Sequence, residues 1–214
     1  MVMTSFNTIN GVPASTNKWL MRDILRGEMG FDGFVMSDFV WGVYDAEHSL
    51  QVAMLAHGMA LIGKNRYGRD CNPEHIVTLA VYHDASEVIT GDMPTPVKYH
   101  SLELRGAYKD VEKMANDRLL AMLPEDLRGC FAPYLCEGRD YDHQIVKAAD
   151  SLSAYLKCVE ERRAGNHEFD AAGEAIRRQL DAITLPEVQD FIREFVPSFS
   201  LTLDELNQPG GNQA

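Results

Sequence analysis

Apolar side chains recur at helical intervals along the chain after Asp45. From Asp45 to about Ile62 they form two stripes on one predicted helix, which is typical of a helix buried in the middle of a bundle. Asn72-Pro73-Glu74 predicts the start of a second helix, because proline is favoured in a first turn, and this helix is expected to run to about Ile89. The two stripes of the first helix are Leu50, Met54 and Leu61, and Val52, Leu55, Met59 and Ile62.

The chain after the second helix is predicted to be largely helical as well. The proline-rich segment 91–96 predicts a loop, since proline and the residue before it resist helix formation. Further helices are expected over 102–122, 124–131, 142–163, 168–182 and 186–195. The predicted class is therefore all-α, a helical bundle.

The two ends of the chain differ from this pattern. The segment 1–44 is rich in glycine, asparagine and serine, and it predicts only a short helix over 15–29 and a brief strand over 34–36. The tail 206–214 is predicted to be disordered. We therefore expect an irregular N-terminal segment over 1–44, one main domain over 45–205 and a short tail.

Charge and hydropathy limit the classes of partner. The chain has 20 basic and 32 acidic residues, a formal charge of −12, so it would repel the backbone of a nucleic acid polymer. A small phosphate ester can still bind where a cation neutralises it, which favours a metal site. The sequence has no run of 18 apolar residues and no secretory signal pattern, so a cytoplasmic protein without a membrane partner is expected. The four cysteines form no CxxC pair, so we expect reduced, mostly buried thiols.

Two histidines and two aspartates on three predicted helices are candidate metal ligands. His48 lies near the start of the first helix, the pair His83-Asp84 near the end of the second, and Asp150 inside the helix 142–163. Imidazole nitrogen and carboxylate oxygen suit Mn²⁺, Co²⁺, Fe²⁺ or Zn²⁺. Side chains of neighbouring helical residues point about 100° apart, so the pair can hold one ion only if other helices complete its shell. Four other histidines are interpreted as structural, namely His57, His75, His100 and His143.

Longer stretches around these residues resemble a known family. The segments are 46–53 (AEHSLQVA), 82–98 (YHDASEVITGDMPTPVK), 146–157 (VKAADSLSAYLK) and 195–205 (FVPSFSLTLDE). In this order they resemble the bacterial 5′-deoxynucleotidase branch of the HD superfamily of metal-dependent phosphohydrolases. The resemblance implies a compact helical HD domain, usually dimeric. Its activity would be the hydrolysis of deoxyribonucleoside 5′-monophosphates with a divalent cation.

The resemblance also implies roles for individual residues. The implied metal ligands are His48, His83, Asp84 and Asp150. Glu87 is implied as the catalytic carboxylate that orients or deprotonates the attacking water, and it lies one predicted helical turn after His83, on the same side. Asp92, on the predicted loop, is implied as a contact to the sugar, where it could accept a hydrogen bond from the 3′-hydroxyl.

Residues 1–44 resemble a different family. The segments 5–14 (SFNTINGVPA), 17–20 (NKWL) and 30–38 (GFDGFVMSD) resemble a piece of a family 3 β-glucosidase, in which the position of Asp38 holds the nucleophile. A retaining glycosidase needs two carboxyl groups about 5 Å apart. The rest of the barrel and the acid-bearing domain are missing, so glycosidase activity is not expected. A gene fusion, a chimeric chain or an engineered graft would each explain this segment.

The stretch 17–23 (NKWLMRD) has a second interpretation. It also resembles the Asn-Arg-Trp…Leu-Met-Arg stretch that opens the deoxynucleotidase family. On that match Trp19 is the aromatic residue that helps to exclude a ribose 2′-hydroxyl, and Lys18 replaces an arginine that contacts phosphate. Lysine lacks the bidentate fork, so the hold on phosphate would weaken. The alternative is a chance match, because 29 residues separate Trp19 from His48, more than the family's spacing.

Two other functions stay open at this point. Related HD proteins cleave triphosphates, so a deoxynucleoside triphosphohydrolase is one alternative. The other is a catalytically impaired HD domain that binds nucleotides, because the N-terminal wall of its pocket has been replaced.

Overall fold

The computed structural model describes residues 2–4, 8–9, 12–13, 35–37, 41–91, 101–136, 138 and 140–206. The chain divides into two compact units, and each is described by itself. Unit 1 comprises Met1–His48 and Ser86–Ala115, and unit 2 comprises Ser49–Ala85 and Asn116–Ala214. The predicted helix 15–29 and the tail beyond residue 206 lie outside the described residues.

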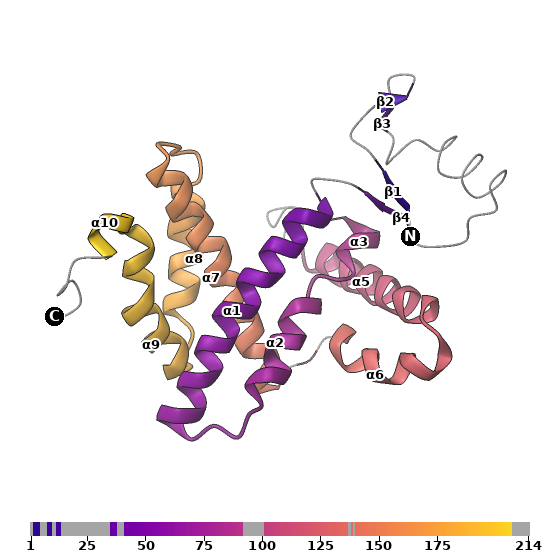
Figure 1. Cartoon of the computed structure of the whole chain (residues 1–214), viewed down its shortest axis with the longest axis horizontal. Coiled ribbons are helices and arrows are strands. Elements are labelled where there is room, and N and C mark those ends of the chain that lie inside the picture. The colour runs from indigo at the N-terminus through magenta and orange to yellow at the C-terminus, as the bar shows by residue number, and fades with distance from the viewer. Residues whose placement is uncertain are drawn as a thin grey trace. The chain divides into compact units, whose positions relative to one another are not determined.

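Unit 1 contains four short strands among its described residues (Figure 1). β1 (Val2–Thr4) pairs in parallel with β4 (Val35–Ser37), with Met3 opposite Met36. β2 (Thr8–Ile9) pairs antiparallel with β3 (Val12–Pro13), so these four residues form a small hairpin. The strand predicted over 34–36 is present, displaced by one residue.

From Trp41 onward the described chain is almost entirely helical, which confirms the predicted all-α class (Figure 1). The helices are α1 (Trp41–Tyr67), α2 (Pro73–Tyr82), α3 (Glu87–Thr90), α5 (Leu102–Met122), α6 (Glu125–Leu135), α7 (Tyr141–Arg163), α8 (Asp170–Asp181), α9 (Pro186–Phe195), the 3₁₀ helix η3 (Val196–Ser200) and α10 (Leu203–Leu206). No helix of the described chain combines the length and apolar character that a membrane crossing requires.

The core of unit 2 forms around α7, which packs against α2, α8 and η3. Burial of the apolar side chains in this core is the main favourable contribution to the folding free energy of unit 2. The largest fully buried side chains are Val52, Met59, Ile76, Ile145, Leu152, Leu156, Leu180, Glu187 and Val188.

The two apolar stripes of α1 have different environments. The stripe that includes Val52 and Met59 is buried in the core, as predicted. The other stripe is not: Leu50 is 60% exposed, Met54 69% and Leu61 40%. The prediction of a helix buried on both sides is therefore wrong, because in unit 2 only one side of α1 contributes to the core.

The end of α1 lies beyond the predicted Ile62, at Tyr67. The Arg66 guanidinium donates to both carboxylate oxygens of Glu194 at 2.7 and 2.8 Å. The Tyr67 hydroxyl donates to Asp190 at 2.7 Å. These bonds to α9 stabilise a final helical turn that contains few apolar residues, so tertiary contacts extend the helix past its apolar pattern.

An ion pair between the half-exposed Arg69 and the buried Glu187 joins the loop after α1 to the first turn of α9. Glu187 is 0% exposed, and its carboxylate accepts hydrogen bonds from Arg69 at 3.0 and 3.4 Å. The Arg69 guanidinium also lies over the Tyr141 ring, 5.5 Å from its centroid. Burial, together with the Glu187 carboxylate, raises the pKa of Tyr141. Gly63 makes room for the Tyr141 hydroxyl, which a Cβ at that position would overlap.

The four cysteines are free thiols, and the expectation that most of them are buried is wrong. Cys130 and Cys136 are exposed, and Cys71 and Cys158 are half-buried. Cys130 lies on α6, most of whose residues face solvent, so its position follows from the exposure of that helix.

Candidate metal centre

The helix α2 ends before the His83-Asp84 pair. Its start is as predicted: the Asn72 side chain accepts from the amides of residues 74 and 75, and Pro73 is in the first turn. The predicted continuation to Ile89 is wrong, since residues 83–86 form a turn and α3 begins at Glu87. The His83 ring explains the break. Its Nδ1 lies 2.7 Å from the Ala80 carbonyl, the group that would accept the residue 84 amide in a continued α-helix.

The same bond fixes the orientation of the His83 ring. A carbonyl oxygen only accepts, so Nδ1 carries the proton and the neutral ring has its lone pair on Nε2. Metal-bound histidines commonly have such a second hydrogen bond to a backbone carbonyl. His83 Nε2 lies 3.0 Å from Asp84 Oδ2 and 3.9 Å from Asp150 Oδ1. The His83 side chain is only 12% exposed, so its Nε2 faces two carboxylates in a largely buried place.

The two carboxylates dominate the electrostatics of His83. Burial alone would lower the pKa of His83, but the Asp150 and Asp84 carboxylates outweigh burial and raise the pKa to about 10. A positive charge is therefore strongly favoured at this point. The same arrangement would attract a divalent cation, which competes with the proton for Nε2.

His48 belongs to the same cluster of ligand atoms. One ligand atom from each of His48, His83 and Asp150 lies within 4.8 Å of the other two. Asp84 adjoins this group through its contact with His83. Three of the four predicted ligands thus come together, and the fourth contacts one of them.

A hydrogen bond that sequence reasoning missed holds α1 against α7 beside these ligands. The Ser153 hydroxyl lies 2.5 Å from Gln51 Oε1. Gln51 follows His48 by three residues, and Ser153 follows Asp150 by three. A polar residue at the same offset after each predicted ligand is the signal that could have indicated this bond.

Of the remaining predicted site residues, Glu87 is described by the structure and the other three are not. Glu87 is the first residue of α3 and is half-buried. Its predicted place on one continuous helix with His83 is wrong because of the turn at 83–86. Asp92, Lys18 and Trp19 lie outside the described residues.

Comparison with known proteins identifies the family. The family model described as 5′-deoxynucleotidase YfbR-like matches residues 43–199, well over half of the chain. The chain belongs to the YfbR-like 5′-deoxynucleotidase family. A 5′-deoxynucleotidase of Vibrio parahaemolyticus is 51% identical over 164 residues, which is 76% of this chain and 84% of that protein. The 5′-deoxynucleotidase YfbR of Shigella boydii is 50% identical over 195 residues, 90% of each chain. The predicted family resemblance is confirmed.

The fold comparison agrees with the YfbR-like assignment. An HD-domain phosphohydrolase from Listeria innocua has a similar fold, with a TM-score of 0.63 over 72% of this chain and 75% of that chain. Its sequence identity is 24%, so this likeness concerns the fold alone. The predicted HD-domain bundle is confirmed.

The N-terminal segment matches a second family as well. The glycosyl hydrolase family 3 N-terminal domain matches residues 1–60, which overlaps the start of the YfbR-like match. The alignment with Shigella boydii YfbR covers 90% of the chain, so it also extends into residues 1–44. The predicted resemblance of this segment to a family 3 glycosidase is therefore confirmed, and the second interpretation of the stretch 17–23 stays a prediction.

Proposed function

We propose that this chain is a metal-dependent phosphohydrolase that converts deoxyribonucleoside 5′-monophosphates to deoxyribonucleosides and phosphate. The observation that carries this proposal is the orientation of His83, whose Nε2 faces Asp84 at 3.0 Å and Asp150 at 3.9 Å. Membership of the YfbR-like family supports the substrate class.

The residues present fit a divalent cation. Two neutral imidazoles and two carboxylates give a donor set with two negative charges, which a dication neutralises. We infer that His48, His83, Asp84 and Asp150 hold Co²⁺, Mn²⁺, Fe²⁺ or Zn²⁺. When bound, such an ion supplies Lewis-acid polarisation of a phosphate oxygen and offsets charge in the transition state.

The family resemblance implies the roles of the other site residues, and the chemistry of each side chain supports its role. The Glu87 carboxylate would orient the attacking water and accept its proton, because an ionised carboxylate is an acceptor of suitable basicity. Asp92 would accept a hydrogen bond from the 3′-hydroxyl of the sugar. Lys18 would contact the phosphate as a point charge, and Trp19 would pack where a ribose 2′-hydroxyl would otherwise lie.

A phosphate-release assay tests this proposal. We expect phosphate from dAMP in the presence of Co²⁺ or Mn²⁺, less from AMP, and none from either nucleotide in EDTA. Glu87→Gln should lower kcat by about 100-fold or more, the usual contribution of a general base, while the protein retains its metal.

The same assay separates the alternatives. Faster release from dATP than from dAMP would identify a triphosphohydrolase, and metal and nucleotide binding without turnover would identify an impaired HD domain. Phosphate release from dAMP that EDTA leaves unchanged would contradict the metal-dependent mechanism. An aryl β-glucoside serves as the negative control, because the N-terminal segment alone should not cleave it.

We also propose that the protein is a cytoplasmic homodimer. The exposed stripe Leu50, Met54 and Leu61 supports a dimer, since a row of large apolar side chains on one helix face is typical of an interface. Light scattering should give a molar mass twice the 24.0 kDa of one chain. Met54→Glu should shift this mass toward that of the monomer, whereas Val111→Glu, at another exposed apolar side chain, should not.

A further inference from the structure

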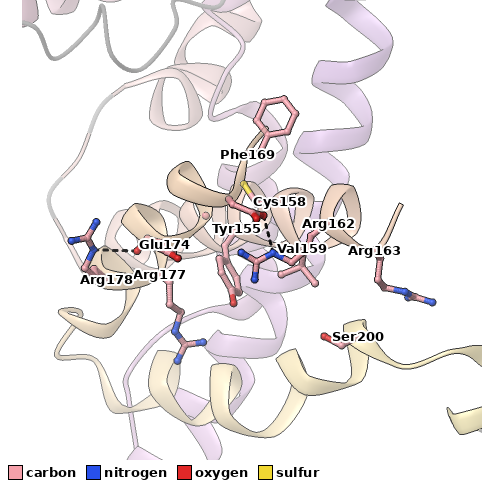
Figure 2. A pocket seen from close by; sticks show the side chains of 12 residues that line it. Tyr155, Cys158, Val159, Arg162, Arg163, Phe169, Glu174, Arg177, Arg178 and Ser200 are labelled. Atoms are coloured by element: carbon pink, nitrogen blue, oxygen red, sulfur yellow. Dashed lines mark hydrogen bonds and ion pairs between the residues drawn. The ribbon is translucent and has the colours of Figure 1, made fainter. Parts of the chain in front are cut away.

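A groove lies between α7 and α8, within unit 2, and none of the four predicted metal ligands lines it (Figure 2). Its volume is about 730 Å³, within the range of small-molecule sites and well above the size of a single phosphate ion. α8 approaches α7 closely at Gly173, where a Cβ would lie 3.1 Å from Cys158 Cβ. Its lining includes Tyr155, Arg162, Arg163, Phe169, Arg177 and Arg178.

The charge of the groove is opposite in sign to that of the chain. Four arginines line it, against two carboxylates, Asp170 and Glu174. The chain as a whole has 32 acidic and 20 basic residues. A local excess of guanidinium groups in an acidic protein produces a positive potential that attracts small anions.

Two of these arginines frame the centre of the groove. Figure 2 shows Arg162 and Arg177 on either side of the Tyr155 ring, and the Arg177 guanidinium lies 5.8 Å from the centroid of that ring. Arg162 is held by Asp170 at 2.8 Å, and Arg177 by Asp181 at 3.0 Å. Each pair is solvent-accessible and uses only part of a five-donor fork, so donors are left for a ligand.

The other two arginines lie toward the two ends of the groove in the view of Figure 2. Arg163 donates to the Phe199 carbonyl at 3.3 Å, and Arg178 to the Glu174 carbonyl at 3.3 Å. Neither has a carboxylate ion-pair partner within the part of the chain that the structure describes. Their charges therefore add to the positive potential along the length of the groove.

An aromatic side chain completes the groove. Phe169 lines it and is 45% exposed, so its ring is accessible to a ligand in the groove. Arginine forks bind phosphate oxygens, and exposed aromatic rings stack on nucleobases. The combination fits a ligand with several negative charges and one planar ring.

We propose that this groove is a second small-molecule site that binds a nucleoside triphosphate. Arg162 and Arg177 would contact the phosphate chain, and Phe169 would stack on the base. Arg162 follows Asp150 by twelve residues on α7, about 18 Å farther along the helix axis, so this site is separate from the metal ligands.

Calorimetric titration of the full chain with dATP in EDTA tests the proposal. We expect one dATP per chain, with the same affinity in Asp150→Ala protein. The double variant Arg162→Gln/Arg177→Gln should bind at least tenfold more weakly. Arg128→Gln is the matched control, because Arg128 is an exposed arginine on α6 that bonds only backbone carbonyls among the described residues, and it should change the affinity less than twofold.

Two more variants keep the test decisive if the double glutamine variant folds poorly. Arg162→Lys/Arg177→Lys retains the charge without the fork and should give an intermediate affinity. Phe169→Ala should weaken dATP but not tripolyphosphate, which lacks a base. No measurable dATP binding, equal dATP affinity in wild-type and glutamine proteins, or loss of binding in Asp150→Ala would each overturn the proposal.

Discussion

Replacement of Asp150 by alanine is expected to lower phosphate release from dAMP about a thousandfold, because the metal contributes several kcal/mol of transition-state stabilisation. Asp150 Oδ1 lies 3.9 Å from His83 Nε2, in the group of ligand atoms that also includes His48. The Asp150 side chain is 44% exposed, so its loss should not disturb the core. Metal content after dialysis, measured by mass spectrometry, should fall together with kcat.

Asp142→Ala provides a matched control for this result. Asp142 is also a carboxylate of α7 that contacts a histidine of α2, since it lies 2.9 Å from His75 Nδ1. Its position two helical turns before Asp150 keeps it out of the ligand group. We expect the Asp142 variant to keep its metal and most of its activity. Wild-type activity and metal content in Asp150→Ala would refute the assigned ligand set.

Arg69→Met is expected to lower the midpoint of thermal unfolding by about 10 °C. The variant keeps an unbranched side chain but leaves the carboxylate of Glu187, which is fully buried, without its guanidinium partner. A buried charge that loses its partner is strongly unfavourable, whereas the ion pair itself adds little. Circular dichroism at 222 nm, recorded against temperature, measures the change.

The double variant Arg69→Met/Glu187→Leu separates these two effects. Removal of both charges leaves no unpaired carboxylate, so the midpoint should recover most of the loss. If the double variant is as unstable as Arg69→Met alone, the packing of Arg69 over Tyr141, rather than its charge, stabilises this region. That outcome would contradict the electrostatic explanation.

The helices were predictable where local chemistry alone determines them. The bounds of α5 and α9 agree with the prediction, and α9 begins at a proline, which favours a first helical turn. The ends of α1 and α2 were not predictable in this way. Arg66 and Tyr67 extend α1 by contacts with α9, more than 120 residues away in sequence. At the end of α2 the His83 ring bonds to the Ala80 carbonyl, which the amide of residue 84 would use in a continued helix.

The metal ligands could be predicted from the sequence, whereas the arginine-lined groove could not. The sequence indicated the ligand residues because each lies in a segment that resembles the family, although their helices are far apart in the chain. It could not indicate the groove, because Arg162 and Arg177 become neighbours only when α8 packs on α7. The arginine pairs at 162–163 and 177–178 are the signal that was present.

The hydrogen bond between His83 and Ala80 has an evolutionary consequence. The acceptor is a main-chain carbonyl, so no side-chain substitution at residue 80 removes it while α2 keeps its shape. In many metalloproteins the corresponding acceptor is a carboxylate, which a single codon change can delete. In this chain the backbone of α2 fixes the tautomer of His83. Substitutions at neighbouring positions should therefore leave that tautomer unchanged.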